Sequence, residues 1–247
     1  MKMFNKNDFT LAEGATHVGN SKNKSKFAFT LAEVLVTLGI IGVVAVLTVP
    51  NVISSYQKKV YVAQLQKAYN QISNAVALLM VDEEVDNLND TYLYCDRDVE
   101  ERDVCLERVG FFLKKYFKVA KDCGQEDELD CFADKVDPLA GEGFGADGFL
   151  SGTYCVFLNS GATLCLRYPH RHPLAVYLDI NGMKKPNIWG RDAFQFSVNY
   201  KGDIAETFDT SEYGKEYYHP DRCEEKSAPY SNGCFNKIIQ DGWKMDY

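Results

Sequence analysis

Apolar residues follow three successive patterns along the chain. Residues 29–49 form an almost unbroken apolar run that contains one carboxylate, Glu33. Residues 54–82 then place apolar side chains three or four positions apart, which is the spacing of a helix with one buried face. Beyond residue 83, shorter mixed runs replace this spacing, and we expect a globular region there. The predicted buried face of the helix consists of Val62, Leu65, Tyr69, Ile72, Val76 and Leu79.

The apolar run has the length of a membrane span. As a helix, residues 29–49 would be about 30 Å long, close to the hydrocarbon thickness of a bilayer. Lys22, Lys24 and Lys26 precede the run, and the positive-inside tendency then keeps the N-terminus in the cytoplasm and exports the remainder. No small-residue cleavage site follows the run, so an ordinary secretory signal peptide fits poorly. We expect Pro50 to kink or loosen the helix.

Helical patterns begin the globular region. Asp98-Val99-Glu100-Glu101 is typical of a capping box, with Asp98 as the N-cap residue, and it predicts a second helix that runs to about Ala120. Residues 122–150 are acidic and rich in glycine, and we interpret them as a loop. Their glycine pattern lacks the strand and helix context of a nucleotide-binding site.

Strand patterns dominate after residue 150. Residues 152–158 and 162–168 flank Asn159-Ser160-Gly161, a three-residue loop of the kind that closes a hairpin. In that register Cys155 lies opposite Cys165, and directly opposed residues can sit at disulfide distance. Three further strand-like runs follow at residues 174–180, 194–200 and 204–206. Helices followed by antiparallel strands predict an α+β domain whose sheet packs on the long helix.

Charge and cysteine content bear on the compartment and on the partners. Residues 1–28 hold five basic and two acidic residues, whereas the remaining chain holds 22 basic and 33 acidic residues. An acidic domain without clustered positive charge argues against nucleic-acid binding. All eight cysteines follow the apolar run, and an even number on one side of a membrane segment indicates disulfides in an oxidising compartment. They show no C-x-x-C spacing, which argues against structural zinc.

The start of the apolar run resembles the processing site of type IV prepilins and of type II secretion pseudopilins. Its sequence is Ala28-Phe29-Thr30-Leu31-Ala32-Glu33-Val34-Leu35. In that family a membrane peptidase cuts after a small residue, usually Gly, and N-methylates the new first residue, typically Phe. Glu occupies the fifth mature position and Pro the twenty-second. A cut between Ala28 and Phe29 gives these positions to Glu33 and Pro50, while Ala28 departs from the usual Gly. The resemblance covers residues 22–55.

The resemblance also implies a role for Glu33. After cleavage Phe29 would carry a positive amine, which Glu33 would neutralise within its own chain or on a neighbouring subunit, and this pairing would set the stacking register. The alternative is that Glu33 merely extends to the membrane interface. A second FTLAE copy at residues 9–13 follows Asp8 and precedes a polar stretch that cannot span a membrane. We interpret it as a non-functional duplication.

Candidate catalytic and metal-binding residues are few. His170 and His172 lie two residues apart without an evident third ligand, and we interpret them as an exposed polar turn. Asp179, Asn181 and Asp192 carry oxygen atoms of the kind that calcium binds. Major pseudopilins have a calcium site in a C-terminal loop, but their motif does not match here residue by residue, and turn chemistry alone explains the Asn-Gly pair. We expect neither metal nor cofactor, with calcium as the open alternative. No nucleophile-and-base arrangement is readable, so we do not expect an enzyme.

The simplest disulfide connectivity joins neighbouring cysteines, and only its third bridge has a geometric argument. The fourth bridge would close residues 224–233, which lack a core pattern and resemble the surface-displayed, disulfide-bounded loop of type IV pilins. We expect this loop to be an exposed contact region. The four expected pairs are Cys95–Cys105, Cys123–Cys131, Cys155–Cys165 and Cys223–Cys234.

The resemblance implies a structural subunit of a type IV pilus or of a type II secretion pseudopilus. The implied partners are sister pilins, the prepilin peptidase, an assembly platform with its ATPase, and the inner membrane. The exported domain would later stand in a periplasmic or cell-surface filament. The alternative is a membrane-anchored extracytoplasmic binding or adhesion protein that never polymerises. The expected segments are a leader at 1–28, a transmembrane half-helix at 29–53, an amphipathic half-helix at 54–82, and a disulfide-bonded domain at 83–247.

Overall fold

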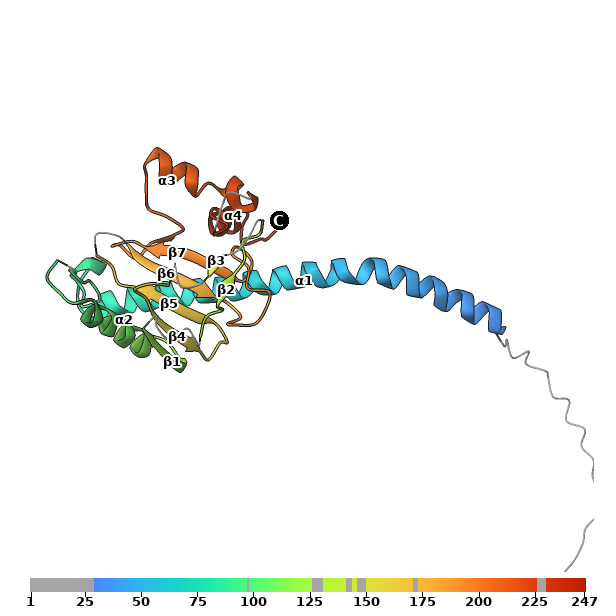
Figure 1. Ribbon diagram of the computed structural model, residues 1–247, viewed down its shortest axis with the longest axis horizontal. Helices are drawn as coiled ribbons and strands as arrows, with labels where there is room; N and C mark the ends of the chain where they lie inside the picture. The colour runs from blue at the N-terminus through green and yellow to red at the C-terminus, as the bar shows by residue number, and fades with distance from the viewer. Residues whose placement is uncertain are drawn as a thin grey trace, which may run out of the picture. The chain divides into compact units, whose positions relative to one another are not determined.

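The chain divides into two compact units, Met1–Val49 and Pro50–Tyr247. A computed structural model describes residues 29–96, 98–125, 131–140, 144–145, 150–170, 173–225 and 230–247 (Figure 1). Ala28, the FTLAE copy at residues 9–13 and His172 therefore lie outside the described residues.

Helix α1 covers Leu31–Asp82 and continues through Pro50 (Figure 1). In the first unit its side chains are mostly exposed and apolar. An 18-residue window of the helix has a mean hydropathy of 2.4, and none of that window is buried. By length and composition this part of the helix has the properties of a membrane anchor or of a signal segment.

The second half of α1 buries one face within the unit Pro50–Tyr247. The predicted stripe is confirmed at five positions, and its sixth member, Tyr69, is half-buried against the same core. Two alanines complete the stripe, which lets the helix approach its neighbours closely. The buried residues are Val62, Leu65, Ala68, Ile72, Ala75, Val76 and Leu79.

A six-stranded antiparallel sheet has the order β1-β4-β5-β6-β7-β8, so that every strand after β1 pairs with its neighbour in the chain. A separate two-stranded sheet pairs β2 (Lys135–Val136) with β3 (Phe144–Gly145). The long helix followed by an antiparallel sheet confirms the predicted α+β class. The six strands are β1 (Val119–Gln125), β4 (Tyr154–Leu158), β5 (Thr163–Arg167), β6 (Leu174–Asp179), β7 (Ala193–Val198) and β8 (Ile204–Ala205).

The β4–β5 hairpin has the predicted register. Cys155 faces Cys165, with a Cα–Cα distance of 4.1 Å. Such a short distance is typical of a non-hydrogen-bonded antiparallel pair, in which the side chains are closest. The strand periodicity and the Asn159-Ser160-Gly161 loop were therefore sufficient to place this pair.

Both faces of the six-stranded sheet are covered. Along β5 and β6, alternate residues such as Leu164 and Val176 enter the core that contains α1 and α2 (Arg102–Tyr116). The intervening residues Cys165 and Tyr177 enter a second, smaller core on the opposite face. Because both faces are buried, the sequences of these strands are nearly continuous apolar runs and do not alternate between apolar and polar residues.

Helix α2 begins later and ends earlier than the sequence predicted. Its N-cap is Glu101, whose side chain makes no capping hydrogen bond, so the proposed capping box at Asp98 is wrong. The neighbouring Glu100 does not cap the helix either, because its carboxylate accepts hydrogen bonds from the Asp96 amide and from Arg108. The helix ends at Tyr116 rather than near Ala120.

Residues 119–125 form strand β1, where the sequence predicted a helix end and a loop. This polar stretch carries no strand signal of its own, and pairing with β4 decides its conformation. Register shifts between Val119 and Lys121 and between Asp122 and Gly124 mark irregularities along the strand. The two-residue strands β2 and β3 further correct the prediction of a loop over 122–150.

The C-terminal segment packs into the core more than the sequence predicted. Cys223 and Cys234 are each 1% exposed, and Phe235 and Ile238 of the following helix belong to the main core. Gly233 has a φ of +93°, and a Cβ atom there would lie 2.0 Å from the His219 carbonyl oxygen. The short helices here are α3 (Glu212–Tyr217), the 3-10 helix η3 (Pro220–Glu224) and α4 (Cys234–Gln240). A further 3-10 helix, η1, covers Leu88–Asp90.

The prediction of an exposed disulfide-bounded loop is therefore wrong for part of that loop. Ser231 and Asn232 are buried, whereas Glu224 and Glu225 are exposed, and residues 226–229 lie outside the described part of the chain. The apolar side chains of α4 were too few to reveal a buried helix from their spacing, and they are buried through contacts with distant strands.

Removing the fourth disulfide should destabilise the whole unit Pro50–Tyr247. We expect Cys223→Ala together with Cys234→Ala to lower the free energy of unfolding by about 2–3 kcal/mol, because the unfolded chain gains the freedom of the opened ring. Urea unfolding of the full chain in detergent, followed by tryptophan fluorescence, measures this change.

The matched control replaces Cys123 and Cys131 by Ala, which opens a ring of similar size away from the C-terminus. The Cys223/Cys234 variant could instead keep its unfolding midpoint, with protease cleavage confined to residues after 223. That result would show that this disulfide orders only the C-terminal segment and does not stabilise the whole unit.

Candidate functional site

The first turn of α1 contains a reciprocal pair of hydrogen bonds. The Thr30 amide donates to Glu33 Oε2 at 2.9 Å, and the Glu33 amide donates to Thr30 Oγ1 at 3.2 Å. This is the geometry of a capping box, in which two otherwise unpaired helix amides are satisfied. Glu33 therefore caps its own helix. The sequence analysis missed this role, although T-x-x-E is readable in the sequence.

Two buried carboxylates lie where β6 and β7 join the loop between them. Asp179 ends β6 and Asp192 precedes β7, and both are fully buried. Asp192 accepts hydrogen bonds from the amides of Asn187 at 2.9 Å and Ile188 at 2.6 Å, and from Asn181 Nδ2 at 3.2 Å. Asp179 Oδ1 accepts from the Asn181 amide at 3.1 Å. These bonds link the two carboxylates through one short loop.

Three oxygen atoms of this loop are buried and accept no hydrogen bond from any described residue. They are Asp179 Oδ2, Asn181 Oδ1 and Asn187 Oδ1. A buried acceptor without a partner costs free energy, so such groups are rare in native proteins. Carboxylate and amide oxygens are also the ligands that calcium prefers. We refer to Asp179, Asn181, Asn187 and Asp192 as the oxygen cluster.

The structure brings together the three residues that the sequence analysis singled out for calcium and adds a fourth. Asn187 was not identified, because it lies outside the Asp-x-Asn-Gly stretch and reaches Asp192 only through the path of the loop. Two asparagines between two aspartates in one hairpin connection were the available signal.

Burial controls the electrostatics of the oxygen cluster. Desolvation, together with the nearby charge of Asp192, raises the pKa of Asp179 to about 8. Desolvation also raises the pKa of Asp192, against the effect of its backbone hydrogen bonds. Neither carboxylate forms an ion pair with a lysine or arginine within the described residues. A bound cation would supply the missing opposite charge.

Glu206 is a third buried acid, but its carboxylate is fully occupied. It accepts hydrogen bonds from the amides of Gly233 at 2.7 Å and Asn236 at 3.1 Å, at the start of α4. Burial raises the pKa of Glu206 to about 8. Glu206 therefore fastens the C-terminal helix to the end of the sheet, which is a structural role.

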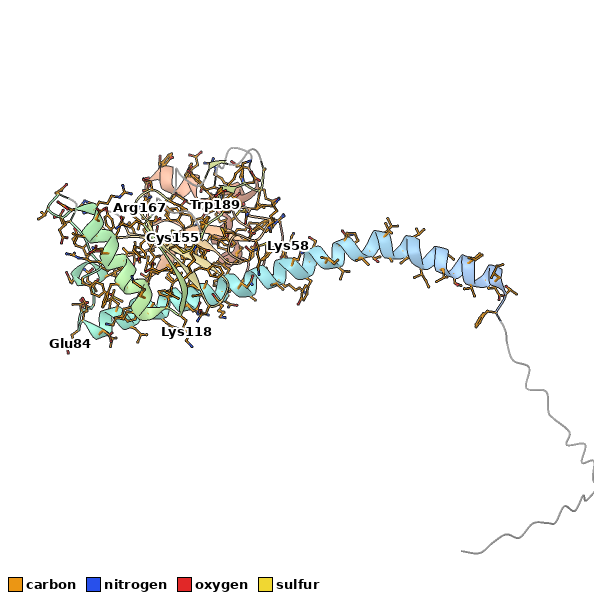
Figure 2. The ribbon with its side chains drawn as sticks, turned by 60° about the horizontal axis from the view of Figure 1, so that its bottom comes forward. Lys58, Glu84, Lys118, Cys155, Arg167 and Trp189 are labelled. Carbon is orange, nitrogen blue, oxygen red and sulfur yellow. A yellow bond between two sulfur atoms is a disulfide. The ribbon has the colours of Figure 1, made fainter. Side chains whose placement is uncertain are left out.

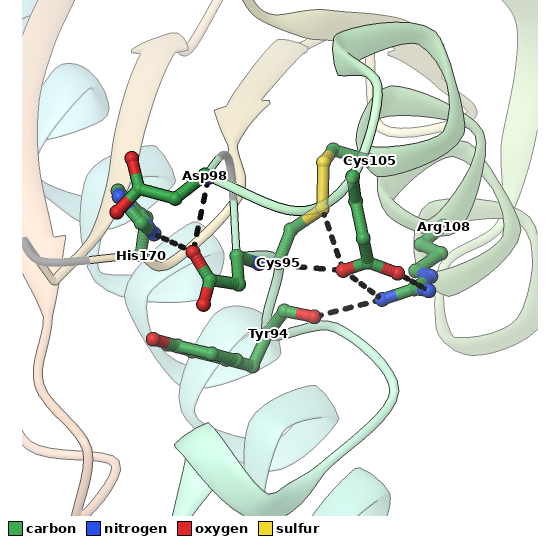
Figure 3. Close-up of a disulfide and its surroundings, with 8 residues drawn as sticks. Tyr94, Cys95, Asp98, Cys105, Arg108 and His170 are labelled. Atoms are coloured by element: carbon green, nitrogen blue, oxygen red, sulfur yellow. Dashed lines mark hydrogen bonds and ion pairs between the residues drawn. A yellow bond between two sulfur atoms is a disulfide. The ribbon is translucent and has the colours of Figure 1, made fainter.

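The other candidate cluster lies around the first disulfide. Figure 3 shows His170 beside an acidic turn, with its Nδ1 3.9 Å from Asp96. Asp96, Asp98 and His170 lie close enough to share an ion, but both carboxylates belong to an accessible turn. Cys95 and Cys105 are joined to each other, so neither is a thiolate ligand. His170 is half-buried and His172 lies outside the described residues, so the exposed polar turn expected at these two histidines stays a prediction.

The four disulfides join the same partners that the sequence analysis set out, and the chain contains no free cysteine. Pro50 lies inside α1, and Phe29 is 82% exposed ahead of that helix. The residues considered for processing and assembly thus lie in or before α1, while the oxygen cluster lies at the end of β6 and in the β6–β7 connection.

No protein-family model, curated protein or solved structure matches the chain. The architecture itself is pilin-like: a long helix with an apolar N-terminal part leads into an antiparallel sheet. Four disulfides in the sheet-containing unit indicate an extracytoplasmic domain.

The buried acids predict stability that falls as the pH rises. Because the folded-state pKa of Asp179 lies above its unfolded value, its contribution is complete below about pH 4 and is lost as the pH rises through about 8. Without divalent cations, the slope should approach about 1.4 kcal/mol per pH unit for each such carboxyl. Urea unfolding in EDTA at several pH values measures it.

Asp179→Asn should remove one carboxyl's share of this slope and leave the shares of Asp192 and Glu206. The matched control is Asp134→Asn, which changes an exposed carboxylate and should leave the slope intact. A slope that is the same in wild type and in Asp179→Asn would mean that Asp179 stays ionised in the folded protein.

Proposed function

We propose that this chain is a non-enzymatic structural subunit of a filament of the type IV pilus or type II secretion pseudopilus class. The observation that carries the proposal is the two-part character of α1. One part is apolar and exposed, and the other is buried in an antiparallel-sheet unit. A helix of this kind anchors the subunit in the membrane and can pack against the same helix of other subunits.

The disulfides support export of the sheet-containing unit across the inner membrane, with the N-terminus left in the cytoplasm. All eight cysteines follow the apolar run, and all eight are oxidised in pairs. Disulfides persist in oxidising compartments and are rare in the cytosol. The unit would then stand in the periplasm or on the cell surface.

The leader would be removed between Ala28 and Phe29 by a prepilin peptidase, which would also N-methylate Phe29. The proposed further partners are sister pilins and an assembly platform driven by an ATPase. The new amine at Phe29 would change the electrostatics of Glu33. Before cleavage the Glu33 carboxylate satisfies the Thr30 amide, and after cleavage it faces a positive charge on its own or a neighbouring subunit.

Variants of Glu33 test whether its charge or its capping hydrogen bond matters. Glu33→Gln keeps a side chain that completes a capping box but removes the charge, whereas Glu33→Ala removes both. We expect both variants to insert into the membrane and both to lose at least about tenfold in filament incorporation, because the amine lacks a partner. Immunoblots of sheared filaments against membrane fractions measure the loss.

Thr30→Ala is the matched control, since it removes half of the capping box and keeps the charge of Glu33. It should assemble nearly as wild type, and mass spectrometry of the mature chain should find a methylated Phe29. Normal assembly of Glu33→Gln would rule out charge pairing. An intact leader, or a cut elsewhere, would favour the anchored binding protein that never polymerises.

We also propose that the oxygen cluster binds calcium, as a second function of the same domain. The observation behind it is the set of three buried oxygen atoms without a hydrogen-bond partner among the described residues. Asp179 and Asp192 would supply negative charge, and Asn181 and Asn187 would supply amide oxygens. A cation there would favour the ionised form of both carboxylates.

Calcium should raise the stability of the folded chain. At a free concentration of about 100 times Kd, a site of this kind adds about 2.7 kcal/mol to the free energy of unfolding. Thermal unfolding in calcium, in magnesium and in EDTA measures the shift. Asp192→Asn should abolish it, whereas Asp134→Asn should retain it. Identical unfolding of the wild type in calcium and in EDTA would exclude the site.

A further inference from the structure

The basic residues of the exported unit are unevenly distributed. Residues 51–81 contain three lysines and no acidic residue, whereas residues 82–247 contain 32 acidic and 19 basic residues. The beginning of the exported part of α1 is thus positive in an otherwise acidic unit. Along the chain this stretch follows directly after the apolar run.

A hollow of about 300 Å³ flanks Lys58 on one side of α1. Its lining brings together three cationic side chains, namely Lys58, Lys185 and Arg191. Lys185 and Arg191 come from the β6–β7 connection, more than 120 positions away in the sequence. The fold therefore gathers charges that the sequence leaves apart.

A second hollow of about 610 Å³ adjoins Lys58 and also contains Lys59 and Lys244. Its lining includes Trp243 and a single carboxylate residue, Asp246. The Lys58 ammonium also donates a hydrogen bond to the main-chain oxygen of Tyr247. Figure 2 labels Lys58 on this part of the helix.

We propose that Lys58, Lys59, Lys185, Arg191 and Lys244, here termed the basic surface, bind the phosphate headgroups of anionic phospholipids. The membrane concerned is the one that residues 29–49 span, so the inference rests on the membrane anchoring in the proposed function. Lys58 lies eight residues after Pro50, or about 12 Å along a helix. The headgroup region adds about 5–8 Å on each side of the hydrocarbon, so the Lys58 backbone lies just beyond it. Side chains of a helix lean toward its N-terminus, which here is the direction of the bilayer.

Two further observations favour a lipid surface as the occupant. Amphipathic aromatic residues are enriched at membrane interfaces, and Trp243 borders the basic surface while Tyr56, two residues before Lys58, is 68% exposed. Lysine and arginine beside a span are the groups that anionic headgroups attract. Phosphate is also recognised bidentately by arginine, which Arg191 can provide.

The basic surface would hold the exported unit against the bilayer before a subunit is extracted. Headgroup binding by several positively charged side chains is weakened by salt and by neutralising any one of those side chains. A neutral bilayer would leave the unit attached only through its apolar helix. The inference therefore concerns the orientation of the unit at the membrane, and not insertion itself.

Quenching of Trp243 by lipid tests the inference. The full chain is placed in nanodiscs, one chain per disc, with lipids brominated near the headgroup. Discs of phosphatidylcholine alone are compared with discs that also contain phosphatidylglycerol. We expect at least twofold stronger quenching in the anionic discs, reduced to the neutral level by about 0.5 M salt. Trp243→Phe should lose the difference, because the other tryptophan, Trp189, is fully buried.

The test variant combines Lys59→Gln, Lys185→Gln and Lys244→Gln, and it should lose the lipid-dependent quenching. The matched control removes the same charge elsewhere through substitution of three exposed lysines by Gln. It should behave as wild type. These control positions are Lys118, Lys201 and Lys215.

Equal quenching in neutral and anionic discs would overturn the inference, as would equal losses in the test and control variants. Quenching that depends on phosphatidylglycerol only when a disc holds two chains would assign the surface to a second copy instead. Failure of the wild-type chain to enter discs at all would contradict the membrane anchoring. This failure can be distinguished from failure of the lipid inference, because the test variant keeps the apolar helix and should still enter the discs.

Discussion

The structure depends on the burial of one face of α1 against the sheet. Leu65, Ile72 and Leu79 are almost completely excluded from solvent, and the same core receives alternate residues of β5 and β6. Burial of this kind supplies most of the free energy that orders a domain. It also fixes which residues of α1 belong to the sheet-containing unit. The apolar residues before Pro50 form no part of that core, so they keep the properties that a bilayer or a neighbouring helix would use.

The features that the sequence predicted correctly are those set by neighbours in the chain. The stripe on α1 repeats every three or four residues, and the Cys155–Cys165 pair is fixed by a three-residue loop. Strand β1 and helix α4 were missed, because each takes its conformation or burial from residues far away in the sequence. In the candidate site, Asp179 and Asp192 were identified by residue type. The part played by Asn187 depended on the path of the loop.

The β6–β7 connection has charged residues both in the protein interior and at the protein surface. At its base lie the buried carboxylates of Asp179 and Asp192, which belong to the proposed calcium site. At its surface Lys185 and Arg191 line a hollow beside α1. Opposite charges this close influence each other. Both affect the pKa of Tyr61 in α1, which is raised chiefly by burial. The charge of Asp192 raises this pKa further, and that of Arg191 lowers it. Calcium bound in the proposed site would therefore alter the electrostatics of the surface that the same loop presents.

The two edges of the six-stranded sheet differ from its interior strands. β8 has only two residues, and β1 is interrupted by register shifts, with Lys121 and Asp122 exposed. Short or irregular edges with charged side chains are poor templates for an added strand. A subunit of the filament proposed above would be concentrated in a membrane and would polymerise, which would put it at particular risk of uncontrolled sheet growth. By making its edges unsuitable for pairing, this fold would confine self-association to its helix and keep an ordered polymer distinct from an amyloid-like aggregate.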